Sequence, residues 1–195
     1  MRAYLVLAVA AALGASGACR HGEPPAAREP EPAAATEALL VRARAEERAR
    51  RYDRARALYQ QAADTAPDSA SAAHAWRQLA SALLFWGELD AGQRALERVV
   101  ALRPGAVSAW HDLGVVRGSR GDDAGAEAAL RRAIALAPSE PRPRIAVAAV
   151  LVKTHRWRDA IAEYQALERL DLPDATRRAV ERALAICRAE EARAP

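Results

Sequence analysis

The chain has 195 residues, of which 51% are hydrophobic and 28% are charged, with a formal net charge of +4. This balance excludes a wholly disordered chain, and two cysteines exclude a disulfide scaffold or a cysteine-rich zinc module. Aromatic residues make up only 5% of the chain, so its core must consist mainly of Ala, Leu and Val, which favours close-packed helices.

Residues 1–18 have the layout of a secretory signal peptide. Arg2 supplies a positive charge, an apolar run extends from Tyr4 to Leu13, and small residues precede Cys19. A membrane-spanning helix needs about 20 apolar residues, roughly twice the length of this run. We therefore expect the segment to direct export and to be removed, not to span a membrane stably.

The end of this segment resembles a bacterial lipoprotein signal, in which the cysteine is acylated and becomes the new N-terminus. The two small residues before Cys19 match that pattern, whereas Ser16 stands where Leu is usual. Ordinary signal peptidase cleavage after Ala18 is the alternative. Residue 20 is Arg, not the Asp of inner-membrane retention, so the resemblance implies an exported protein. It would be lipid-anchored through Cys19 in the outer membrane of a diderm host, facing the periplasm.

Residues 19–35 are rich in Pro and Glu and contain no Leu, Ile, Val or aromatic residue. Such a segment cannot bury apolar surface, so we expect an extended spacer. The spacer would hold a folded body away from the lipid anchor.

A repeat of 34 residues is the strongest signal in the chain. The residues that recur at this offset are Trp76 and Trp110, Leu79 and Leu113, Gly87 and Gly121, Leu96 and Leu130, and Pro104 and Pro138. The pattern resembles the tetratricopeptide repeat, a helix-turn-helix unit. The resemblance implies an all-α solenoid of about four units, at residues 36–69, 73–106, 107–140 and 141–174. Three extra residues separate the first two units.

The apolar pattern supports this alignment independently. Trp76, Leu79 and Leu83 lie on one face of a helix that Gly87 ends, and we expect Trp76 and Trp110 to be core residues. Two positions are small in every unit, which lets paired helices approach closely. The first set is Ala43, Ala80, Gly114 and Ala148, and the second is Ala55, Gly92, Ala126 and Ala160.

Residues 175–195 are expected to form a capping helix and a tail, with Asp174 as the N-cap. Val180, Leu184 and Cys187 share one apolar face, which would cover the exposed edge of the last repeat. This position predicts a buried, unreactive Cys187 thiol.

No motif in the chain predicts catalysis, a metal site or a cofactor. The sequence has no phosphate-binding glycine loop, no Gly-x-Ser-x-Gly elbow and no His-Glu-x-x-His, and its histidines lie in separate segments. Arginines alternate with acidic residues and form no basic stripe with stacking aromatics, so we expect no nucleic-acid partner. We expect a non-enzymatic protein with no small-molecule substrate.

The resemblance also implies a concave groove lined by the first helix of each unit. The candidate groove residues are Arg77, Gln78, Ser81, Phe85, His111, Asp112, Arg142, Ile145 and Lys153, and the first unit would add Glu37, Leu40, Val41, Arg44, Glu47 and Arg48. Arg77, His111 and Arg142 could contact carboxylates of a partner. Phe85 and Ile145 could seat its apolar side chains.

These features together predict a protein-binding adaptor or assembly factor at the bacterial cell envelope. Its partner would be a protein or an extended peptide segment, and it would contact the membrane through the lipid anchor. The alternative is an accessory subunit of an envelope enzyme complex, in which another chain supplies the catalysis.

Overall fold

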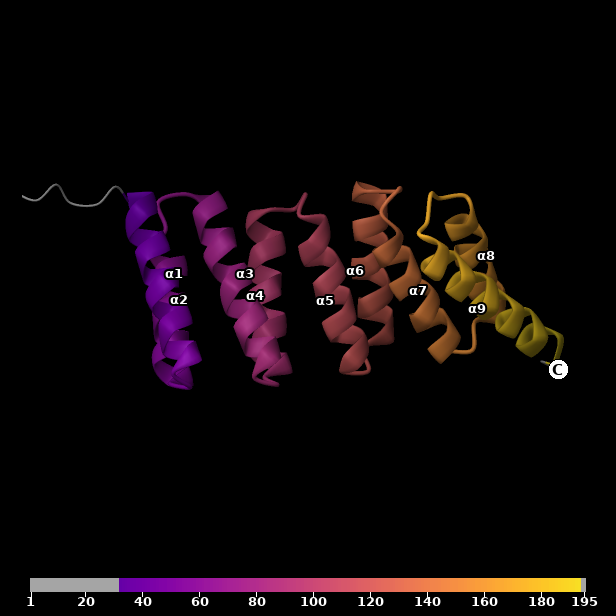
Figure 1. Ribbon diagram of the computed structural model, residues 1–195, viewed down its shortest axis with the longest axis horizontal. Helices are drawn as coiled ribbons and strands as arrows, with labels where there is room; N and C mark the ends of the chain where they lie inside the picture. The colour runs from indigo at the N-terminus through magenta and orange to yellow at the C-terminus, as the bar shows by residue number, and fades with distance from the viewer. Residues whose placement is uncertain (1–31, 194–195) are drawn as a thin grey trace, which may run out of the picture.

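The computed structural model describes residues 32–193, which fold into helices and contain no strand (Figure 1). The helices are α1 (Pro32–Arg48), α2 (Tyr52–Asp64), α3 (Ser69–Phe85), α4 (Leu89–Leu102), α5 (Val107–Ser119), α6 (Asp123–Leu136), α7 (Pro141–Lys153), α8 (Trp157–Glu168) and α9 (Asp174–Arg193). The predicted signal peptide and Cys19 lie outside the described residues. The helix α1 begins at Pro32, so the end of the segment that we expected to be a spacer is the first turn of a helix.

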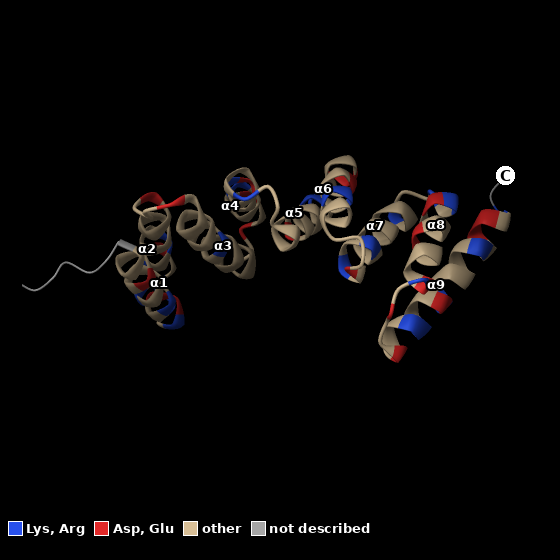
Figure 2. Ribbon diagram, turned by 90° about the horizontal axis from the view of Figure 1, so that it is seen from above, with Lys and Arg blue, Asp and Glu red and all other residues tan. Residues whose placement is uncertain are grey.

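The helices form a curved row of hairpins in two layers. The odd-numbered helices lie along one side of the row and the even-numbered helices α2, α4, α6 and α8 along the other (Figure 2). Each hairpin packs on the next through the contacts α2 with α3, α4 with α5 and α6 with α7. This arrangement is the all-α solenoid that the repeat predicts.

The turn inside each hairpin contains one residue in the left-handed backbone region. Gly87 and Gly121 occupy this position with φ of 83° and 84°, and Arg50 and His155 occupy it in the first and last hairpins with φ of 58° and 57°. A side chain in this region costs about 1–2 kcal/mol, which explains why glycine recurs there. The first and last turns therefore carry backbone strain that the middle turns avoid.

The three extra residues between the first two units lengthen α3 at its N-terminus. This helix has 17 residues, compared with 13 in α5 and in α7. Asp68 caps it, because its carboxylate accepts hydrogen bonds from the backbone N–H groups of Ala70 and Ser71, both at 2.8 Å. The insertion therefore adds a helical turn and not a loop.

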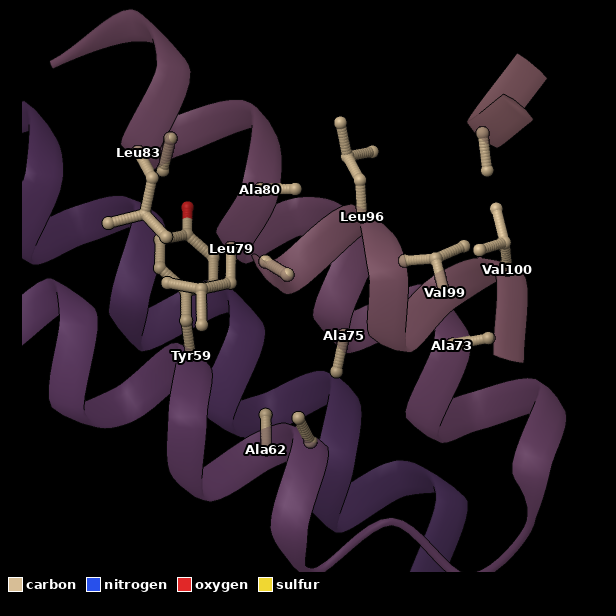
Figure 3. Close-up of a cluster of buried hydrophobic side chains, with 14 of the residues drawn as sticks. Tyr59, Ala62, Ala73, Ala75, Leu79, Ala80, Leu83, Leu96, Val99 and Val100 are labelled. Atoms are coloured by element: carbon tan, nitrogen blue, oxygen red, sulfur yellow. The ribbon is translucent and has the colours of Figure 1, made fainter. Parts of the chain in front are cut away.

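Both sets of small residues are buried. An added Cβ at Gly114 would lie 2.5 Å from Cγ of Leu130, and one at Gly92 would lie 2.5 Å from Cδ2 of Leu84. The helices thus approach so closely that a larger side chain at either glycine would require the facing leucine to move. In the N-terminal half of the core, the Tyr59 ring from α2 lies beside Leu79 and Leu83 of α3 (Figure 3).

Trp76 and Trp110 lie at the edge of the core, which differs from the expectation that they are core residues. Both pack against buried side chains but are only partly buried themselves. The indole Nε1 of Trp110 donates a hydrogen bond of 2.9 Å to the carbonyl oxygen of Pro104. A tryptophan keeps its N–H at the periphery because a buried indole needs an acceptor.

The last helix, α9, packs on α8 and buries Val180, Leu184 and Cys187. Asp174 is the first residue of this helix and not the residue before it, so the predicted N-cap is displaced by one position. No helix within residues 32–193 is both long enough and apolar enough to cross a membrane.

Candidate binding groove

The inner side of the curve is lined by α1, α3, α5 and α7, the helices that carry the predicted groove residues. A crevice of about 330 Å³ lies between α5 and α7, and we call it the α5–α7 crevice. Its lining residues are Gly114, Val115, Gly118, Ser119, Asp123, Leu130, Ala146, Ala149, Val150 and Lys153. An added Cβ at Gly118 on α5 would lie 3.9 Å from Cγ2 of Val150 on α7, which is an ordinary contact distance. The small residues Gly118, Ala146 and Ala149 leave the crevice open. Val115 is 44% exposed at its wall.

Lys153 closes one end of the crevice. Its Nζ donates hydrogen bonds to Oδ1 of Asp123 at 2.6 Å and to the carbonyl oxygen of Gly118 at 3.2 Å. These contacts join α7 to the preceding hairpin. A partner carboxylate at Lys153 would therefore have to compete with Asp123.

Charged side chains gather at the N-terminal end of α7, on the same inner side. Nε of Arg142 donates to Oε1 of Glu140 at 2.7 Å, and this contact lowers the pKa of the Glu140 carboxyl. Nδ1 of His111 lies 3.0 Å from Oδ1 of Asp112. Charges on α5 act on the start of α7 as well. Asp112 favours the charged form of Arg142, and His111 contributes to the lowered pKa of Glu140. The structure thus places His111 and Asp112 of α5 near Glu140 and Arg142 at the start of α7.

A second, smaller hollow of about 260 Å³ lies toward the N-terminus of the groove. It is lined by Ala73, His74, Arg77, Val99, Arg103, Ala106 and Ser108. Within residues 32–193, neither Arg77 nor Arg103 forms an ion pair. Sequence reasoning missed Arg103, because this residue follows α4 and does not belong to a groove-lining helix. The indication in the sequence was that Arg103 comes just before Pro104, where the chain passes from one unit to the next.

Phe85 is 82% exposed at the C-terminal end of α3, as expected for a residue on an open face. Gln78 is partly buried and Ser81 is exposed on the same helix. Ile145 is only partly available, because it packs against the core around Val147 and Leu151.

One of the first-unit residues is wrongly assigned to the groove. Leu40 is completely buried and belongs to the core. The equivalent residue is the exposed Arg77 in the second unit, the partly buried His111 in the third and the partly buried Ile145 in the fourth. Val41, the next residue, is 52% exposed.

The described residues contain no group of His, Cys, Asp and Glu side chains that could hold a metal ion.

Cys187 is 1% exposed, and burial raises the pKa of its thiol. A raised pKa disfavours the thiolate, which is the form that acts as a nucleophile.

The fold and this inner groove define an α-solenoid of helical hairpins. The tetratricopeptide repeat family matches residues 25–70, 40–85 and 77–141, and the chain belongs to this family.

Solved structures support the same fold. MamA is 25% identical over 68% of this chain and 77% of its own, with a TM-score of 0.59. A second MamA structure, from AMB-1, is 21% identical over 82% of this chain and 84% of its own, with a TM-score of 0.62. YrrB, described as a TPR protein with an unusual peptide-binding site, is 16% identical over 78% of this chain and 76% of its own, with a TM-score of 0.62. No curated protein matches the sequence.

Proposed function

We propose that this protein is a non-enzymatic adaptor or assembly factor of the bacterial cell envelope that captures a segment of a partner protein in its concave groove. The observation that carries the proposal is the α5–α7 crevice, an apolar hollow with charged groups at both ends. An apolar side chain of the partner would enter between Val115 and Val150. YrrB, which shares the fold, is described as a peptide-binding protein, which supports the same class of ligand.

The charged ends of the groove would orient the bound segment. Arg77 is exposed, and its guanidinium is available to a carboxylate of the partner. Arg142 is 65% exposed and would exchange Glu140 for a partner carboxylate. Because a helical scaffold is already ordered, binding restricts the partner more than the groove.

Cross-linking pull-downs from envelope fractions test this function. A photo-reactive residue at position 115 would sit in the crevice, and one at position 186 on α9 would serve as a control on an exposed side chain away from it. We expect a discrete cross-linked partner from position 115 alone.

Charge reversal provides the second arm of the test. The double variant Arg77→Glu, Arg142→Glu is expected to abolish capture without lowering the melting temperature. Arg132→Glu, an exposed position on α6, is the matched control and should retain capture. Capture that survives the double variant would place the binding surface outside the groove.

We also propose that Cys19 carries the lipid that holds the protein at the outer membrane, facing the periplasm. The proposal rests on the small residues before Cys19 and on Arg at position 20. The variant Cys19→Ala should move the protein from the membrane to the soluble fraction. Unchanged retention in the membrane fraction would contradict the lipid anchor.

A further inference from the structure

A larger hollow lies away from the groove, between the even-numbered helices α2 and α4. It measures about 580 Å³, and we call it the α2–α4 cleft. Its lining residues are Arg56, Gln60, Trp76, Leu79, Leu83, Ala91, Arg94, Ala95, Glu97 and Arg98. Trp76, Leu79 and Leu83 come from α3, which packs against both α2 and α4 and forms the floor. The partial exposure of Trp76 is thereby explained.

The corresponding space between α6 and α8 is bridged by ion pairs. Arg131 of α6 contacts Glu163 of α8 at 2.9 Å, and Arg156 contacts Glu127 at 2.6 Å. Both bridges join the last two hairpins on their outer side.

Only one of these bridges has a counterpart in the α2–α4 cleft. Arg56 pairs with Glu88 at the turn, with the charges exchanged relative to Glu127 and Arg156. The positions equivalent to Arg131 and Glu163 are Gln60 and Ala95. Gln60 instead donates to Asp64 of its own helix at 3.1 Å, and the alanine offers no polar group. Beyond the Arg56–Glu88 pair at the turn, the cleft therefore stays open.

The unbalanced charge on this cleft is positive. Arg94 and Arg98 lie one turn apart on α4, and neither forms an ion pair with any residue in the described range. The Arg98 guanidinium carbon stands 5.6 Å from the centre of the Trp76 ring. Glu97, the acidic lining residue, is already paired with Arg117 at 3.0 Å.

The position of Arg94 is specific to this unit. The equivalent residues in the next two units are Ala128 and Ala162, both exposed alanines. The alanines show that the fold needs only a small residue at this position. Arg94 is larger than the fold requires, and it lines the open cleft.

We propose that the α2–α4 cleft is a second docking site, which binds an acidic segment of a partner protein carrying an apolar side chain. The apolar side chain rests on Trp76 and Leu83, and the flanking carboxylates pair with Arg94 and Arg98. Charge complementarity selects the acidic segment. Burial of the partner's apolar side chain on the floor contributes binding free energy, because exposed ion pairs alone contribute little.

The shape of the cleft favours a protein segment over a flat surface. Trp76 lies in the floor between two helices, where a planar membrane would not reach it. With the concave groove on the other side, the protein could hold two partners at once, so this inference goes beyond the proposed function and does not depend on it.

The test uses a fluorescein-labelled peptide in which Leu and Phe are each flanked by pairs of Glu. A matched peptide has Gln at every Glu position. Fluorescence anisotropy with the full mature chain should give at least about tenfold weaker binding for the Gln peptide, which corresponds to about 1.4 kcal/mol. Binding of the Glu peptide should weaken as the salt concentration rises.

Variants then locate the peptide. Arg94→Glu with Arg98→Glu should weaken binding of the Glu peptide at least about tenfold. Arg132→Glu, the position equivalent to Arg98 in the next unit, is the control and should leave binding unchanged. Both arginines are exposed, and circular dichroism melts would confirm that the variants fold; if the double Glu variant does not, Arg94→Gln with Arg98→Gln replaces it.

Three results would overturn the proposal. The first is equal binding of the Glu peptide to the wild type and to the Arg94, Arg98 double variant. The second is loss of binding in Arg77→Glu, Arg142→Glu, which would place the peptide in the concave groove and leave the proposed function standing. The third is no binding of the Glu peptide to the wild type at concentrations up to about 1 mM.

Discussion

Replacing Gly114 by alanine is expected to destabilise the protein, whereas the same change at Gly92 is expected to be nearly neutral. Both glycines are buried in helices, and at both an added Cβ would lie 2.5 Å from the nearest leucine atom. The difference lies in what that leucine can do. Leu130, opposite Gly114, is 1% exposed, whereas Leu84, opposite Gly92, is partly exposed and can rotate toward solvent.

The backbone separates the two sites further. The Cβ at Gly114 would also lie 3.1 Å from the carbonyl oxygen of Ala126, but at Gly92 the nearest backbone atom is 3.6 Å away. Overpacking a core costs about 1–3 kcal/mol, and we assign the upper value to Gly114→Ala and the lower to Gly92→Ala. Alanine gains about 1 kcal/mol over glycine in a helix. The net loss of stability is then about 2 kcal/mol at Gly114 and near zero at Gly92.

Urea unfolding followed by circular dichroism of the helical signal would measure both changes. Because repeat proteins can unfold in parts, the comparison should rest on transition midpoints as well as on fitted free energies. A destabilisation of about 2 kcal/mol lowers the melting temperature by roughly 4–8 °C for a chain of this size. Equal midpoints for the two alanine variants would refute the reasoning from close helix contact.

Three further predictions concern the turns, the buried thiol and acid. Arg50→Gly should stabilise the protein by about 0.5–1 kcal/mol in thermal melts, because it removes left-handed strain, and Gly87→Ala should do the reverse; a lower melting temperature for Arg50→Gly would contradict this. In a Cys19→Ala background, Cys187 should react with a thiol reagent only as fast as α9 detaches or unfolds, and immediate reaction in buffer would show that it is accessible. Hydrogen bonds from Gln93 and then Arg117 lower the pKa of Glu97. The stability that ionised Glu97 contributes is therefore complete above the ordinary carboxyl pKa and is lost as the pH falls through the lowered pKa. Glu97→Gln should therefore reduce the loss of stability between about pH 5 and pH 3, as measured by melts across that range.

The sequence predicted the repeat architecture well, because each unit carries its own signals. Helical spacing of Trp76, Leu79 and Leu83 and the break at Gly87 are local features, and they predict the hairpins without knowledge of the rest of the chain. The buried small residues follow from the same periodicity. Local pattern could also show that three residues had been inserted before the second unit, but only the Asp68 cap shows that they extend a helix.

The binding surfaces were less accessible to sequence reasoning, because they depend on side chains that meet from separate helices. The α5–α7 crevice exists because Gly118, Leu130 and Ala149 come from three different helices and leave a space between them. The pattern within one helix does not reveal such a space. Leu40 was misplaced because the repeat pattern assigns the same face to every unit. The left-handed conformation of His155 could not be predicted either, because it is glycine at a turn that indicates this conformation.

The neighbour-to-neighbour packing has a consequence for how the chain reaches its final form. The helices that share substantial contacts lie no more than two places apart in the order α1 to α9. Proteins dominated by such local contacts have a low contact order and fold fast. Under the export that we propose, a chain threaded N-terminus first through a narrow translocation pore would complete each hairpin as it emerged, without waiting for distant segments on the other side.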